Sequence, residues 1–247
     1  MQLTVVGCGD AFGAGGRLQT CFHAKFLRSQ VLIDCGASTM IGLHRLDIDP
    51  NEIGTIVLSH LHGDHYSGLI WLIMHAQHVS DRRSPLVIIG PHGTRERYLA
   101  TAELLFPGST NIPPKFEIEF LEFQDGQKIS NDDFSVTPFA VSHPSGALSA
   151  ALRFESGGKV LSFSGDTEWV ENVPKCAAGA DLFITECYAY SGPAYYHMTW
   201  ETISDCMHLI DAKHILLSHM SESMLANLDR IHSDRVTPAK DGMVINF

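Results

Sequence analysis

The string Ser59-His60-Leu61-His62-Gly63-Asp64-His65 contains four potential metal ligands within six residues. It follows an apolar, strand-like segment, so His60 and His62 alternate along extended backbone and point the same way. Asp64 and His65 stand at the following turn, where they can face a second point in space. Imidazole together with carboxylate suits Zn²⁺, and Mn²⁺ and Fe²⁺ are also feasible. One loop can therefore serve two divalent cations.

Three more potential ligands follow apolar segments elsewhere in the chain, each after a small residue. They are His143 after Ser142, Asp166 after Gly165, and His219 after Ser218. Loops at the edge of a rigid sheet gather functional side chains. The sequence therefore predicts that these three side chains complete a metal site begun by residues 60–65.

Hydrophobic patterning indicates the elements that must position these ligands. Alternating or continuous apolar runs predict strands at residues 3–7, 21–27, 30–34, 56–59, 86–89, 115–123, 134–141, 148–154, 159–164, 181–185 and 214–217. Helical spacing predicts helices at residues 64–79, 94–106 and 199–211, and Asp49-Pro50 predicts a short helix start. Gly157-Gly158 predicts a two-residue hairpin turn. No linker interrupts the pattern, so we expect one domain over residues 1–247, with two layers of strands covered by helices.

The amino-acid composition limits the kinds of molecule that the protein is expected to bind. The 247 residues include 14 histidines, and 17 Lys and Arg against 28 Asp and Glu give a net charge of −11. That charge argues against a broad surface for nucleic acid or anionic membrane and leaves a small molecule as the expected partner. The six cysteines are scattered and form no CxxC pair, and the sequence shows neither a secretory leader nor a long apolar stretch. These features predict a cytoplasmic protein that does not enter the membrane.

The ligand pattern HxHxDH, followed by separated His, Asp and His, resembles the signature of the metallo-β-lactamase superfamily. Within it, the chain is most similar to the ribonuclease Z-related hydrolases over residues 7–221. The motifs that carry this likeness occur in the same order: the loop at residues 7–20, Ser164-Gly165-Asp166-Thr167, Thr185-Glu186, His197-Met198-Thr199 and Leu217-Ser218-His219-Met220-Ser221.

The resemblance implies an α+β fold, a four-layer αββα sandwich of two mixed sheets flanked by helices. It also implies two divalent metal ions, with Zn²⁺ expected and Mn²⁺ or Fe²⁺ feasible. His60, His62 and His143 would hold one ion, Asp64, His65 and His219 the other, and Asp166 would bridge them. A metal-bridging hydroxide would be the nucleophile.

The resemblance further implies three catalytic side chains. Asp64 would hold and orient the nucleophile, His197 would assist departure of the leaving alkoxide, and Glu186 would orient His197. A protonated imidazole is suited to that role because the leaving oxygen of a phosphodiester requires a proton.

The leading hypothesis is a dinuclear phosphodiesterase acting on a small anionic phosphodiester, such as a cyclic nucleotide or cyclic sugar phosphate. Only 23 positions separate His143 from Asp166, whereas ribonuclease Z carries a long arm for tRNA in that region. A lactone, carboxyl-ester or amide hydrolase on the same metals is the first alternative, and a di-iron redox protein is a distant one. A homodimer is expected on base rates.

Overall fold

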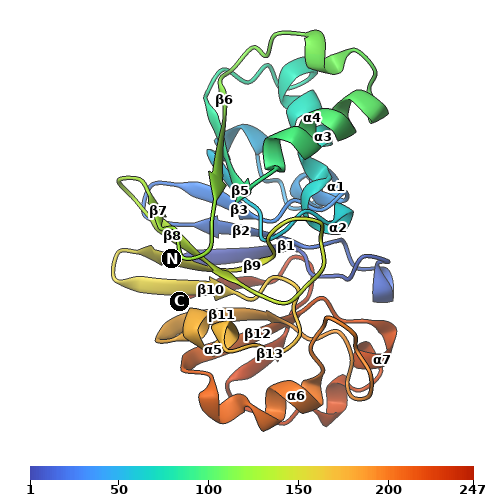
Figure 1. Ribbon diagram of the computed structural model, residues 1–247, viewed down its shortest axis with the longest axis vertical. Helices are drawn as coiled ribbons and strands as arrows, with labels where there is room; N and C mark the ends of the chain where they lie inside the picture. Colours follow the sequence, from blue (N-terminus) through green and yellow to red (C-terminus); the bar gives the residue numbers. More distant parts are fainter.

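Strands with largely continuous runs of buried side chains build two mixed seven-stranded sheets in the computed structural model, which describes residues 1–247 (Figure 1). The first sheet has the order β14-β1-β2-β3-β4-β5-β6. Its strands are β1 (Gln2–Gly7), β2 (Cys21–Lys25), β3 (Gln30–Ile33), β4 (Thr55–Val57), β5 (Leu86–Pro91), β6 (Ile118–Phe123) and β14 (Val244–Asn246). The second sheet has the order β13-β12-β11-β10-β9-β8-β7. Its strands are β7 (Ile129–Ser130), β8 (Ser135–Ala140), β9 (Ala150–Ser156), β10 (Lys159–Phe163), β11 (Ala180–Glu186), β12 (Ala212–Ser218) and β13 (Val236–Pro238).

Parallel pairing in each sheet decides where the functional loops lie. Strands β3 to β6 run parallel in the first sheet, and β10 to β13 run parallel in the second. The carboxyl ends of parallel neighbours share one edge of a sheet, and ligands bind in the crevice beyond that edge. The loops that follow β4, β10, β11 and β12 start from such edges.

Helices cover the outer face of each sheet. The first sheet carries α1 (Thr39–Arg45), α2 (Gly63–Tyr66), α3 (Gly68–His78) and α4 (Thr94–Leu105), and the second carries α5 (Asn172–Ala177), α6 (Trp200–Asp205) and α7 (Glu222–Leu225). Figure 1 shows the two helical layers at opposite ends of the molecule with both sheets between them. No helix is both long and apolar enough to cross a bilayer. The predicted four-layer α+β sandwich is confirmed.

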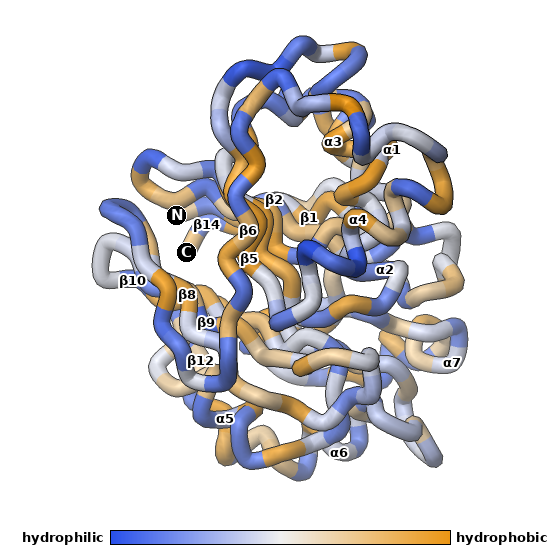
Figure 2. Tube along the Cα trace, turned by 45° about the horizontal axis from the view of Figure 1, so that its top comes forward, coloured by the Kyte–Doolittle hydropathy of each residue, from blue (hydrophilic) through white to orange (hydrophobic).

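Three apolar clusters hold the layers together, one between the sheets and one beneath each helical layer. Between the sheets, Phe22 of β2 meets Phe163 of β10 edge to face, with ring centroids 5.5 Å apart. Figure 2 shows the hydrophobic residues concentrated along strands such as β5 and β6 and the polar residues along the connecting loops. Because both faces of each sheet are buried, the strands are held in place. The sheet edges from which the ligand loops start are held in place with them.

Two predicted helices differ from the observed ones. The helix predicted at 64–79 is divided into α2 and α3 at Ser67, because Gly68 lies against the chain at Gly36 and its amide donates to Cys35. The helix predicted at 199–211 ends at Asp205, since Arg235 occupies the carbonyls of Met207, Ile210 and Ala212. Satisfying those carbonyls from another segment removes the need for further helical turns.

The smallest elements were not predicted from the sequence. Strands β7, β13 and β14 have two or three residues, and α1, α5 and α7 have seven residues or fewer. Runs of this length are too short to show a period of 2.0 or 3.6. Asp49 does cap a short helix as predicted, of the 3₁₀ type, and Gly157-Gly158 forms the hairpin turn with positive φ at both residues.

Candidate metal centre

Segments far apart in the sequence meet at one edge of the sandwich. His60 and His62 follow β4, while His143, Asp166 and His219 follow β8, β10 and β12. Two backbone hydrogen bonds tie these segments across the sheets: Ala150 N donates to Ser59 O at 3.0 Å, and His219 N donates to Cys8 O at 3.1 Å. All seven ligands predicted from the sequence lie at this edge, in two neighbouring groups.

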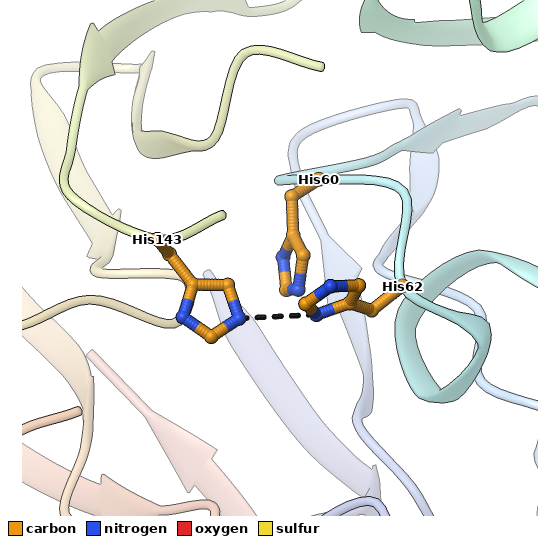
Figure 3. A group of neighbouring side chains, drawn as sticks. All are labelled: His60, His62 and His143. Atoms are coloured by element: carbon orange, nitrogen blue, oxygen red, sulfur yellow. Dashed lines mark hydrogen bonds between the residues drawn. The ribbon is translucent and has the colours of Figure 1, made fainter. Parts of the chain in front are cut away.

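The first group consists of three imidazoles, those of His60, His62 and His143 (Figure 3). Their ring centroids are 4.8 to 5.0 Å apart, and one nitrogen from each ring lies within 4.8 Å of the others. The closest approach is between His143 Nε2 and His62 Nδ1, at 3.0 Å. Three imidazole nitrogens converging on one point are a donor set typical of zinc sites.

The second group consists of Asp64, His65, Asp166 and His219. The Oδ2 atom of Asp166 lies 3.2 Å from Nε2 of both His65 and His219. The same oxygen lies 3.9 Å from Nε2 of both His60 and His143 in the first group. The Asp166 carboxylate therefore stands between the two groups, where a bridging ligand would be required.

Outer hydrogen bonds fix which nitrogen of each ring faces the centre. The carboxylate of Asp34, fully buried, accepts from His65 Nδ1 at 2.6 Å and from Ser59 Oγ at 2.8 Å. Because that hydroxyl donates to Asp34, it accepts from His60 Nδ1 at 3.0 Å. His65 and His60 thus present Nε2 to the centre, as expected when a second partner orients a ligating imidazole.

Sequence reasoning did not find Asp34. The pattern predicts this residue only as the end of a strand, but it is a buried carboxylate with φ of 58°, in the left-handed region. The available signal was an aspartate directly after the apolar run of β3, comparable to Asp166, which follows β10 after two small residues.

The first group has an arrangement that favours a positive charge between its rings. His62 Nε2 donates to Pro144 O at 3.1 Å, and His143 Nδ1 donates to Tyr196 O at 2.9 Å. In neutral rings the facing atoms, His62 Nδ1 and His143 Nε2, both carry lone pairs. Two lone pairs 3.0 Å apart repel unless a positive charge lies between them.

Two buried polar atoms support the same conclusion. His60 Nε2 and Asp166 Oδ1 have no hydrogen-bond partner, although buried polar groups are almost always paired. Leaving such atoms unpaired costs about 1–3 kcal/mol each. The donor types, their convergence and these unpaired atoms fit divalent metal ions.

The charges at the edge are strongly coupled. Burial disfavours ionisation of Asp166 and Asp64, but the surrounding imidazoles more than compensate and hold the pKa of both carboxyls well below the ordinary value. Burial opposes the charge on His219 too, yet Asp166 and Asp64 raise its pKa to about 9. At His60, burial and the neighbouring imidazole of His65 lower the pKa. The site therefore holds anionic carboxylates that favour positive charge beside them.

A carboxylate–imidazole pair lies next to the two groups. Both oxygens of Glu186 lie 3.1 Å from His197 Nδ1, and Glu186 also accepts from the amides of Thr167 and Met198. Burial raises the pKa of Glu186, while at His197 the carboxylate outweighs the effect of burial and raises the pKa of the ring. The His197 ring lies 4.9 Å from that of His143 between centroids.

The loop between Glu186 and His197, which carries four of the six tyrosines of the chain, borders this pair. Tyr188 stacks on His197, with centroids 4.8 Å apart and planes at 24°. Tyr195 and Tyr196 are exposed, and Tyr196 has φ of 63°, a left-handed conformation in which its carbonyl reaches His143. The loop is therefore attached to the metal centre through its backbone.

Comparisons with known proteins agree with this geometry. A curated ribonuclease Z from Bacillus licheniformis is 29% identical over 277 aligned residues, covering 90% of this chain and 88% of that protein. The metallo-β-lactamase fold protein YhfI from Bacillus subtilis superposes with a TM-score of 0.81 at 22% identity, covering 99% of this chain and 98% of that one. A diphosphatase from the PhnP family superposes with a TM-score of 0.79 at 20% identity, covering 100% and 97%.

The fold and the donor set define a metal-dependent hydrolase of the metallo-β-lactamase superfamily, similar to ribonuclease Z. The resemblance seen in the sequence motifs is confirmed. A family model described as "Anti-Pycsar protein Apyc1" matches residues 1–238, and the chain belongs to that family.

Proposed function

We propose that this metal-dependent phosphodiester hydrolase acts on a small phosphodiester, such as a cyclic nucleotide or a cyclic sugar phosphate, rather than on a folded RNA. The observation that carries the proposal is the meeting of two donor groups and the Glu186–His197 pair at one sheet edge. Those parts suit phosphodiester cleavage, in which the attacking and leaving oxygens need separate stabilisation.

The preference for a small substrate rests on what surrounds the centre. Between His143 and Asp166 the chain forms a short loop, then β9, the Gly157-Gly158 turn and β10, with no protruding arm. The alignment with the Bacillus licheniformis ribonuclease Z spans 277 residues, more than the 247 of this chain, so that relative carries insertions. The net charge of −11 also opposes a polyanion over a broad surface.

We propose that the centre holds two divalent ions, with Zn²⁺ favoured by the imidazole and carboxylate donors. His60, His62 and His143 would hold one, Asp64, His65 and His219 the other, and Asp166 would bridge them. When bound, such ions polarise the phosphoryl oxygen and lower the pKa of a shared water.

Three side chains of the protein would bind and transfer the protons of the attacking water and of the leaving group. Asp64, about a tenth exposed, accepts a hydrogen bond from the attacking water and orients it towards phosphorus. Glu186 holds His197 through Nδ1, which directs Nε2 away from the carboxylate for donation to the leaving oxygen. Proton delivery to a poor leaving group contributes about 10²–10⁴-fold to the rate.

The test is a panel of substrates with the zinc-loaded protein. Cyclic nucleotides, a cyclic sugar phosphate, bis(p-nitrophenyl) phosphate and precursor tRNA form the phosphodiester arm, and lactones, carboxyl esters and an amide form the other. We expect turnover of small phosphodiesters, with tRNA cleaved at least tenfold less efficiently. Turnover confined to lactones, esters or amides would overturn the proposal.

A variant pair tests the role of His197. His197→Ala should retain bound metal and slow substrates with alkoxide leaving groups about 10²-fold or more, while nitrophenyl esters lose little. His208→Ala, at an exposed histidine in the short 3₁₀ turn Met207–Leu209, is the matched control. Equal losses on both substrate types would remove His197 from the acid role.

A further inference from the structure

A guanidinium from the first helical layer reaches the loops that carry the three-histidine group. Arg97 lies on α4, outside every motif identified in the sequence. Its Nη1 donates to Leu61 O at 3.1 Å and to Ser145 O at 3.3 Å. The two carbonyls come from segments more than 80 positions apart, so one side chain bridges two distant loops.

Both carbonyls belong to ligand loops. Leu61 stands between His60 and His62, and Ser145 lies two positions after His143. A second bond joins the same loops, because His62 Nε2 donates to Pro144 O at 3.1 Å. Arg97 therefore holds together the two backbone segments whose imidazoles must converge on one point.

Helix α4 is itself held firmly against the metal loop. Residues 97 and 101 are one turn apart and share a face of the helix. On that face Thr101 Oγ1 is hydrogen-bonded to the hydroxyl of Tyr66, the residue after His65, at 2.5 Å. At the start of the helix, Glu122 of β6 accepts from the amides of Gly93 and Arg95. A helix fixed at these points is a rigid support for the guanidinium.

The receiving loop is shaped to admit the arginine. Gly146 has φ of 77°, and a Cβ added there would lie 3.1 Å from Arg97 Nη2. A side chain at 146 would be strained by the backbone and would press on the guanidinium. The glycine thus leaves the space that the bridge occupies.

We propose that Arg97 is a positioning residue that sets the spacing of the three-histidine group by tying the 60–62 loop to the 143–146 loop. The inference rests on the metal centre proposed above. Lysine would not replace it, because both carbonyls are bound by Nη1 of a planar guanidinium, whereas a lysine side chain ends one bond short of that nitrogen.

The experiment compares Arg97→Gln and Arg97→Lys with Arg95→Gln, an exposed arginine on the same helix. Zinc affinity of the full chain is measured by competition with a chromophoric chelator. Losing a hydrogen bond that orients a metal ligand weakens binding about 10–100-fold, and Arg97 orients its ligands through the loops that carry them. We expect that loss for one of the two ions in both Arg97 variants and none in Arg95→Gln.

A second measurement does not depend on metal or on activity. Hydrogen exchange of the chelator-treated protein should accelerate in Arg97→Gln over residues 60–66 and 142–149, with other segments unchanged. Gly146→Ala should give the same pattern without removing the arginine. Excess zinc should restore bis(p-nitrophenyl) phosphate turnover in Arg97→Gln through kcat, with KM unchanged.

The results separate the two proposals. Wild-type zinc affinity together with wild-type exchange in Arg97→Gln would overturn the positioning role while leaving the metal centre intact. Arg97→Lys behaving as wild type would also overturn it, since charge alone would then suffice. A wild-type protein that binds no zinc would overturn the proposed function, and the exchange comparison would still decide whether Arg97 joins the loops.

Discussion

His23 should make the protein sensitive to mild acid. This side chain is on β2, is fully buried beneath the first helical layer, and has no hydrogen-bond partner at either ring nitrogen. Burial is the main cause of its low pKa of about 4, reinforced by Lys25 and opposed by Gln30 and Glu52. The unfolded chain binds the proton near pH 6.5, so between pH 6.5 and 4 the unfolded state holds more protons than the folded state.

The magnitude follows from that difference. A lowering of about 2.5 pH units corresponds to about 3.4 kcal/mol, at 1.36 kcal/mol per unit. This loss of folding stability is absent above pH 6.5, grows as the pH falls, and reaches its full value below the pKa of His23 in the folded state. At pH 5 the linkage relation gives about 2 kcal/mol of it, a large fraction of the 5–15 kcal/mol typical of a domain.

The assay is urea unfolding of chelator-treated protein at intervals from pH 7.5 to pH 5. His23→Leu removes the titrating group, so its free energy of unfolding should fall by about 2 kcal/mol less than that of the wild type across this range. His78→Gln, at an exposed histidine on α3, should follow the wild type. The reasoning is refuted if His23→Leu and wild type show the same loss of stability between these pH values.

Three further changes test the centre and the core. Asp166→Asn should lower bound zinc from two ions towards one and abolish turnover. The reason is that the amide lacks the negative charge that lies between the two donor groups. Elemental analysis showing two tightly held ions would contradict the bridging role. Asp34→Asn should weaken zinc binding about 10–100-fold by releasing His65 Nδ1 and Ser59 Oγ, and unchanged affinity in chelator competition would remove Asp34 from the supporting shell. Phe22→Ala should cost about 3–5 kcal/mol, since it empties space against Phe163 between the sheets; a loss below 1 kcal/mol in urea unfolding would show that this contact is not part of the core.

Much of the site could be predicted from local spacing. His60 and His62 alternate after a strand, so their side chains point in one direction. Asp64 and His65 lie in the following turn and point in another, so two ligand directions arise within six residues. The structure brings these side chains together in the two groups that the spacing indicates. Long apolar runs such as β11 and β12 were equally visible, because their burial on both faces leaves a continuous hydrophobic signal.

What the sequence determined by itself was the type of ligand and the strand or turn on which each stands, since both depend on neighbours within a few residues. The tertiary structure alone decided which ring nitrogen faces the centre, because Asp34, Pro144 and Tyr196 accept from the other nitrogen across gaps of 31 to 82 positions. It also decided where the helix after Thr199 ends and which arginine bridges the ligand loops. Those outcomes depend on packing between segments distant in the chain, and no local period records such contacts.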